Sequence, residues 1–176
     1  MNKIFSIAIL IFFCSANTSA QTLPAWFSTY FKQQKLDAKY DLKAYAKPSY
    51  LMGDFNGDGV KDVAALVIEK KTRKNGVLIM HQKEGGGYFA LGAGTKYGKK
   101  GFDEADNLEW VKGWKVNKSR LVYETVFNAG GDIVGGKKIK LKSDALSLWD
   151  LIDGEPYSGG TIYWTGKKYD WIHEGE

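Results

Sequence analysis

The chain has 176 residues, and its 25 lysines and arginines exceed its 20 aspartates and glutamates, giving a formal net charge of +5 at pH 7. The basic residues are spread along the chain in twos and threes. The densest group, residues 69–74, stands beside an Asn-Gly pair, so a solvated hairpin tip explains it better than a nucleic-acid patch. We therefore expect no nucleic-acid partner.

The first 20 residues have the three-part layout of a secretory signal peptide. Lys3 supplies the basic start, residues 4–13 form a largely apolar run, and small and polar residues lead to Ala20. We predict cleavage near Ala20 and export to the periplasm or the extracellular space, with residues 21–176 as a single β-rich domain. The apolar run is shorter than the roughly 20 residues needed to cross a bilayer, and no later run approaches that length, so we expect no membrane span.

Cys14 is the only cysteine and lies inside the predicted signal peptide. A lipid-anchored form would attach here, but Phe12 and Phe13 precede the cysteine where bacterial lipoprotein signals have small residues. After cleavage the chain has no thiol, so neither disulfides nor thiolate-bound metal can stabilise it. A chain of about 156 residues is long enough to bury a stabilising hydrophobic core in one domain.

The segment after the signal peptide predicts one short helix. Pro24 suits a first helical position, and aromatic residues from Trp26 to Phe31 recur at helical spacing, which predicts a helix ending at about Gln34. Residues 35–48 are polar with scattered apolar side chains and give no assignment. From Tyr50 onward, short runs between glycine and asparagine turns predict strands at 63–68, 76–81, 121–127, 137–141, 161–164 and 169–173.

Two turn signals predict how these strands pair. Asn75-Gly76 should connect residues 63–68 to 77–80, and Thr165-Gly166 should connect 162–164 to 169–172. Residues 63–68 include no polar side chain, which is typical of a central strand covered on both faces. We predict an α+β fold that is mostly β, with the N-terminal helix packed on an antiparallel sheet of hairpins.

Residues 54–62, with the sequence DFNGDGVKD, carry the strongest chemical signal. Oxygen-bearing side chains alternate with other residues, and Gly59 at the sixth position permits the turn that points the next carbonyl inward. Three carboxylates in nine residues would repel one another, whereas a divalent cation turns that repulsion into binding energy. A plain turn rich in Asp, Asn and Gly is the alternative. The predicted Ca²⁺ ligands are Asp54, Asn56, Asp58, the carbonyl of Val60, and Asp62.

The spacing of this loop excludes an EF-hand, because the twelfth position, which must be a bidentate acid, is Ala65. Residues 53–59 together with Asp62 and the apolar run after it resemble the calcium loop of FG-GAP and VCBS repeats, found in integrin-type propellers. The resemblance implies side-chain ligands at Asp54, Asn56, Asp58 and Asp62, a backbone ligand at Val60, and a role in adhesion or ligand binding. Because the chain has one copy and a propeller needs several blades, we carry over the metal site but neither the propeller nor the adhesion role.

The aromatic residues allow two interpretations. Six tryptophans and ten tyrosines could fill a core that has no disulfide, which we favour for most of them, or could stack on sugars or dock a partner. Tyr163, Tyr169 and Trp171 are the candidates for an exposed role, because they lie in the predicted hairpin near the carboxyl end.

Three functions remain open from the sequence. The first is an exported, calcium-stabilised, non-enzymatic module that binds an unidentified protein or glycan as a monomer. The second is a hydrolase of a glycan or cell-wall polymer, with acids from Asp103, Glu104, Asp106 and Glu109 or from Glu124, although charged clusters usually just face water. The third is an inhibitor of a secreted enzyme. His81 and His173 are the only histidines, and the sequence places no triad partner beside either.

Overall fold

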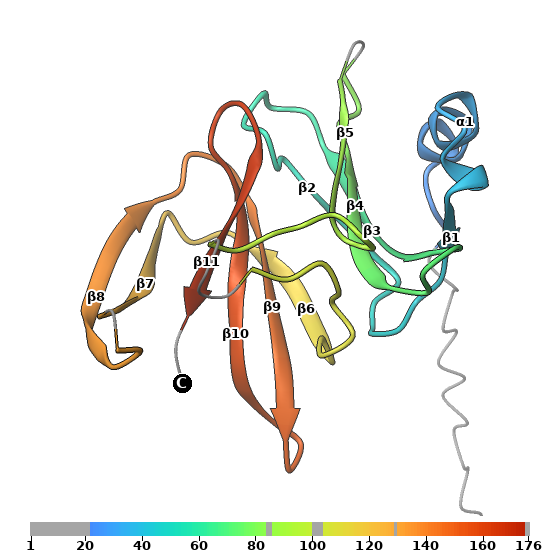
Figure 1. The fold of residues 1–176 in the computed structure, drawn as a ribbon. Helices are drawn as coiled ribbons and strands as arrows, with labels where there is room; N and C mark the ends of the chain where they lie inside the picture. The colour runs from blue at the N-terminus through green and yellow to red at the C-terminus, as the bar shows by residue number, and fades with distance from the viewer. Residues whose placement is uncertain (1–21, 84–85, 100–103, 129, 175–176) are drawn as a thin grey trace, which may run out of the picture.

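The structure, a computed structural model, describes residues 22–83, 86–99, 104–128 and 130–174 (Figure 1). The predicted signal peptide lies outside the described residues. No helix within the described ranges is long and apolar enough to cross a membrane. In chain order the elements are α1 (Ala25–Gln33), the short 3₁₀ helix η1 (Leu36–Ala38), β1 (Tyr40–Leu42), β2 (Tyr50–Gly53), β3 (Asp62–Glu69), β4 (Asn75–Met80), β5 (Tyr88–Gly92), β6 (Gly113–Asn117), β7 (Leu121–Phe127), β8 (Ile133–Lys140), β9 (Ala145–Ile152), β10 (Glu155–Trp164) and β11 (Tyr169–Glu174).

The strands form antiparallel sheets, which confirms the prediction of a mostly β fold. The first sheet has the order β1-β3-β4-β5, and β2 pairs with β3 next to β1. The second sheet has the order β11-β10-β9-β6. The remaining strands, β7 and β8, pair only with each other and form the hairpin at the left of Figure 1.

The main core lies between the two larger sheets. Leu66 and Ile79 of the first sheet belong to the same buried cluster as Leu148, Ile162 and Trp114 of the second. Burying these large apolar side chains is the main favourable contribution to folding in a chain without disulfides. As predicted, β3 is a central strand, and its residues from Asp62 to Ile68 are buried on both faces.

The helix α1 occupies the position predicted from its aromatic spacing. Phe27 and Phe31 stack with ring centroids 6.0 Å apart and belong to a buried cluster with Val63 and Leu78 on the other face of the first sheet. In Figure 1 the helix lies at the side of that sheet, next to β1. Within the described residues the fold is therefore mostly β with one short α-helix, and this helix does not form a clear layer over the sheet.

One predicted turn is correct and the other is wrong. Trp164 pairs with Tyr169 around the Thr165-Gly166 turn, as expected. β3 and β4 also pair as expected, but the chain reverses through residues 70–74, and Gly76 lies inside β4. Glycine is needed there for packing, because a Cβ on Gly76 would lie 2.6 Å from the amide nitrogen of Ala93.

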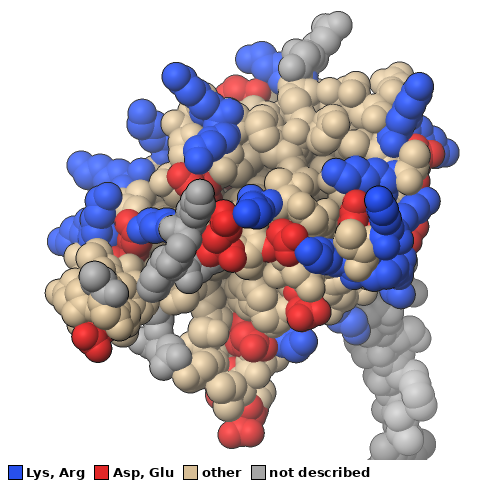
Figure 2. All heavy atoms as spheres, viewed as in Figure 1, with Lys and Arg blue, Asp and Glu red and all other residues tan. Residues whose placement is uncertain are grey.

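The basic side chains on the face seen in Figure 2 gather at its two sides. Lysine and arginine side chains lie over β8 on the left and over the β3–β4 end of the first sheet on the right, with acidic side chains and uncharged surface between them. The excess positive charge is therefore not concentrated in one patch on this face.

Candidate functional site

The loop between β2 and β3 is shaped by its own acidic side chains. Asp54 Oδ1 accepts hydrogen bonds from the amides of Gly57 at 2.7 Å and Asp58 at 3.0 Å, and Asp54 Oδ2 accepts one from the amide of Gly59 at 3.0 Å. Gly57 and Gly59 have φ angles of 82° and 84°, which favour glycine. The carboxylate of Asp54 therefore faces the inside of a tight turn.

The next two oxygen-bearing side chains repeat this arrangement. The amide of Asp58 donates to Asn56 Oδ1 at 2.9 Å, and the amide of Val60 donates to Asp58 Oδ1 at 2.9 Å. Asn56 Nδ2 also donates to Asp58 Oδ2 at 3.1 Å. The hydrogen bond from the Val60 amide is the main reason that the pKa of Asp58 is lowered. The structure thus brings Asp54, Asn56 and Asp58 together around one turn.

Asp62 has a different environment from the other predicted ligands. It is fully buried, its Oδ2 accepts the amide of Phe55 at 3.0 Å, and its Oδ1 accepts the amide of Gln82 at 3.1 Å. Burial raises its pKa to about 6, because loss of water around the carboxylate outweighs these hydrogen bonds. Asp62 joins the loop to the end of β4 through backbone amides.

The composition of this loop suits a hard cation better than a soft one. Among the described residues, no three His, Cys, Asp or Glu side chains gather in a way that could hold a metal ion by themselves. The predicted ligand set differs in kind, because it adds the amide oxygen of Asn56 and the carbonyl of Val60. Oxygens from the first, third and fifth positions of one turn match the donors that Ca²⁺ prefers, so these residues fit the ion in chemistry.

The loop is also fastened to the second sheet. The amide of Asp54 donates to Asp144 Oδ2 at 3.2 Å, and the amide of Asp144 donates to the carbonyl of Asp54 at 2.9 Å. Ser143 Oγ donates to the carbonyl of Phe55 at 2.9 Å, and the Phe55 ring is fully buried in the core between the sheets. The loop therefore holds the start of β9 against the end of β2.

An aromatic cluster lies near the loop, in which His81 and Tyr169 are buried and Phe89 and Trp164 are half-buried. His81 Nε2 is 2.8 Å from the hydroxyl of Tyr169, and the His81 ring lies 5.2 Å from that of Phe89 and 5.3 Å from that of Trp164. Burial lowers the pKa of His81, while Asp58 and Asp54 act in the opposite direction. A histidine with these neighbours fills the core. Of the aromatic residues predicted as candidates for an exposed role, Tyr169 and Trp171 are buried.

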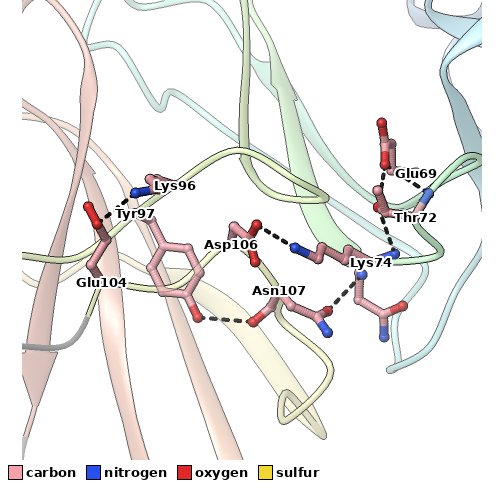
Figure 3. Close-up of polar contacts among 9 residues, drawn as sticks. Glu69, Thr72, Lys74, Lys96, Tyr97, Glu104, Asp106 and Asn107 are labelled. Atoms are coloured by element: carbon pink, nitrogen blue, oxygen red, sulfur yellow. Dashed lines mark hydrogen bonds and ion pairs between the residues drawn. The ribbon is translucent and has the colours of Figure 1, made fainter. Parts of the chain in front are cut away.

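Three of the carboxylates considered for a hydrolase, Glu104, Asp106 and Glu124, each pair with a different lysine. Figure 3 shows Glu104 paired with Lys96 at 2.9 Å and Asp106 paired with Lys74. The neighbouring residue Asn107 accepts a hydrogen bond from the amide of Asn75 at its Oδ1, at 2.9 Å, and one from the hydroxyl of Tyr97 at its backbone carbonyl, at 3.2 Å. Asn107 therefore connects β4 to the loop that follows β5.

The other proposed acids are equally dispersed. Glu124 is buried and paired with Lys99, and Glu109 is exposed. Asp103 lies outside the described residues. The described acids are therefore occupied in separate ion pairs or face solvent, rather than facing each other across a cleft.

A scan against protein-family models gives no match for this chain, and comparisons with curated proteins and with solved structures give none either. The resemblance to FG-GAP and VCBS loops therefore depends on the spacing within residues 53–62 alone. Function has to be argued from the geometry of the chain itself.

Proposed function

We propose that the chain is an exported, monomeric binding module whose fold is stabilised by calcium bound at residues 54–62. The supporting observation is the inward turn of oxygen-bearing side chains at alternate positions of one loop. The proposed ligands are the side chains of Asp54, Asn56, Asp58 and Asp62 and the carbonyl of Val60.

The electrostatics of the loop support a cation. Three carboxylates lie within nine residues, and the Asn56 amide, which donates to Asp58, compensates only part of their charge. A divalent cation would replace mutual repulsion with attraction. Calcium that binds only the folded state adds about 2.7 kcal/mol of stability when its concentration is a hundredfold above its dissociation constant.

The role of this calcium would be structural. Asp54 and Phe55 are bound to Asp144 and Ser143, so fixing the loop also fixes the junction between the two sheets. Of the described acids that could serve a hydrolase, Glu104, Asp106 and Glu124 are paired with separate lysines and Glu109 is exposed, which favours binding over catalysis. The partner in this proposal is an exported protein or a glycan.

A melting experiment on the chain from residue 21 tests the calcium site. The melting temperature of the unsubstituted protein should rise when calcium replaces a chelator, and Asp58→Ala should abolish that rise because it removes the fifth-position carboxylate. Asp132→Ala is the matched control, because Asp132 closes another Asn- and Gly-containing turn by accepting a hydrogen bond from Asn128 at 3.0 Å. A shift of equal size in Asp58→Ala, or none in the unsubstituted protein, contradicts the proposal.

The inhibitor alternative has one observation in its favour. The β7–β8 hairpin carries two adjacent apolar side chains, Ile133 and Val134, that are 63% and 60% exposed. Large apolar groups on a projecting hairpin are typical of surfaces that enter a partner's cleft. Capture of a secreted enzyme by the unsubstituted chain, with loss of capture by Ile133→Asp, would support this alternative. Capture unaffected by Ile133→Asp would exclude the hairpin as the inhibitory element.

A further inference from the structure

The second sheet has an outer face that points away from the main core. Paired residues of antiparallel strands lie on the same face, so Lys115, Ser147 and Thr161 form one row across β6, β9 and β10. Trp149 lies in the next row and is paired with a glycine on each side, Gly113 of β6 and Gly159 of β10. Apolar residues of the same strands, such as Leu148 and Ile162, lie on the opposite face of the sheet and belong to the core.

Two adjoining cavities cover this face and share Glu174 of β11. One, of about 270 Å³, is lined by Lys115, Ser147, Trp149 and Tyr157 among others. The other, of about 540 Å³, continues between the sheet and the β7–β8 hairpin, where its lining includes Asn117, Leu121, Tyr123 and Ile133. We call the two cavities together the outer groove. Its aromatic side chains Tyr123 and Tyr157 are 54% and 45% exposed.

The floor of the outer groove is a directed chain of hydrogen bonds. Thr161 Oγ1 donates to Glu174 Oε1 at 2.7 Å, so the contact of 3.1 Å between Ser147 Oγ and Thr161 Oγ1 must use the proton of Ser147. Asn117 Nδ2 then donates to Ser147 Oγ at 3.0 Å. Every proton in the chain points toward the carboxylate of Glu174, and bonds aligned in this way strengthen one another.

This series of hydrogen bonds uses only one carboxylate oxygen of Glu174. Its Oε1 holds the hydroxyl of Thr161, which is fully buried, while no hydrogen bond between described residues uses its Oε2. Because Glu174 lines both cavities, Oε2 is placed to accept hydrogen bonds from hydroxyl groups of a bound molecule.

Trp149 forms a flat platform beside this acceptor. A Cβ built on Gly113 would lie 2.4 Å from the indole ring, so the ring rests directly on the backbone of β6. The ring is half-buried, and Lys115 Nζ lies 5.7 Å from its centroid. The electron-rich face of the indole attracts the Lys115 ammonium that lies over it, and the C–H groups on the apolar face of a sugar ring can stack on the same ring.

The charge of the outer groove selects against strongly charged ligands. Among the described residues that line it, Lys115 and Glu174 are the only charged side chains, and their charges are opposite. The lysines gathered over β8 at the left of Figure 2 are absent from its lining. A ligand that is rich in hydroxyl groups and has no net charge complements a stacking platform, a carboxylate acceptor and a single ammonium donor.

We propose that the outer groove binds a neutral polysaccharide chain, with one sugar ring stacked on Trp149, a hydroxyl of the bound chain donating to Glu174 Oε2, and further rings running toward Tyr123. This inference rests on the proposed function as a binding module and names its ligand class. The two cavities, which share Glu174, are together large enough for more than one ring, so this proposal favours a polymer or long oligosaccharide over a single sugar.

Affinity electrophoresis of the chain from residue 21 tests the inference. Gels containing hydroxyethyl cellulose, xylan, glucomannan or dextran serve as neutral probes, and polygalacturonate serves as an anionic probe. At least one neutral polymer should retard the protein, and Trp149→Ala should weaken that affinity by about tenfold or more, as expected for a central aromatic contact. Glu174→Gln keeps the size of the side chain and should also weaken the affinity. Tyr88→Ala, which removes an exposed aromatic side chain on β5, should leave it unchanged.

The outcomes separate this inference from the calcium site. The proposal that the outer groove binds a neutral polysaccharide is refuted if no neutral polymer retards the protein or if polygalacturonate alone does. It is also refuted if both Trp149→Ala and Glu174→Gln keep full affinity. Glu174→Gln decides the question if Trp149→Ala fails to fold. A calcium-dependent melting shift without retardation refutes only the glycan inference, whereas retardation without a calcium shift refutes only the calcium site.

Discussion

The buried carboxyl group of Asp62 should make the stability of the chain depend on pH. Burial raises the pKa of Asp62 from the ordinary 3.8 to about 6, so the folded chain binds this proton more tightly than the unfolded chain. The stabilisation from protonated Asp62 is therefore complete below about pH 4 and is lost as the pH rises through about 6. A shift of about two pKa units, at ~1.4 kcal/mol per unit, corresponds to about 3 kcal/mol in the free energy of unfolding.

Asp62→Asn isolates this effect because asparagine does not titrate. We expect urea unfolding, followed by tryptophan fluorescence in a calcium chelator, to show the unsubstituted protein losing about 3 kcal/mol relative to the variant between about pH 4 and pH 7. The lowered pKa of His81 makes its contribution to stability increase as the pH rises, opposite to that of Asp62. Because His81 is present in both proteins, its contribution cancels in the comparison. A difference in stability that is constant, or that moves in favour of the unsubstituted protein as pH rises, would refute the reasoning.

Two substitutions test the packing that positions the candidate site. Phe55→Ala should lower the free energy of unfolding by about 3–5 kcal/mol, because the ring is fully buried between the sheets, while Ile133→Ala at a 63% exposed position should change it little. Urea unfolding measures both, and equal effects would contradict the burial of Phe55. Gly76→Ala should cost about 1–3 kcal/mol, because its methyl group would meet the Ala93 backbone at 2.6 Å. Its control is Gly136→Ala, where the nearest atom would be 3.9 Å away, and a Gly76→Ala variant as stable as this control would rule out the close approach.

The sequence predicted those parts of the fold in which local preference and tertiary pairing agree. The apolar run of β3 indicated a central strand, and Thr165-Gly166 indicated the last hairpin. β9 was not predicted, because Ala145, Leu146 and Leu148 favour helix as single residues, and pairing with strands on both sides overrides that preference. Asn75-Gly76 resembled a turn because the same glycine that permits turns also permits close backbone contact.

The site was predictable only where its residues are neighbours in sequence. The alternating spacing of Asp54, Asn56 and Asp58 indicated a loop in which these side chains turn inward, but nothing local indicated that Asp62 would bind the amide of Gln82, which lies 20 residues away. The outer groove left a weaker signal. Its polar residues come from four strands, and only the hydroxyl group of Ser147, between Leu146 and Leu148, marks it in the sequence.

The junction between the loop and β9 has a consequence for the order of folding. Asp54 and Asp144 are 90 residues apart in sequence, and Phe55 and Ser143 are 88 residues apart. Closing such a long stretch of chain has a large entropic cost, so this contact should form after the local hairpins of each sheet. Interactions that form late mainly slow unfolding and have little effect on the folding rate. Whatever stabilises this junction should therefore lengthen the lifetime of the folded state, a property that would benefit the protein if it is exported as proposed, because cytoplasmic chaperones could not refold it there.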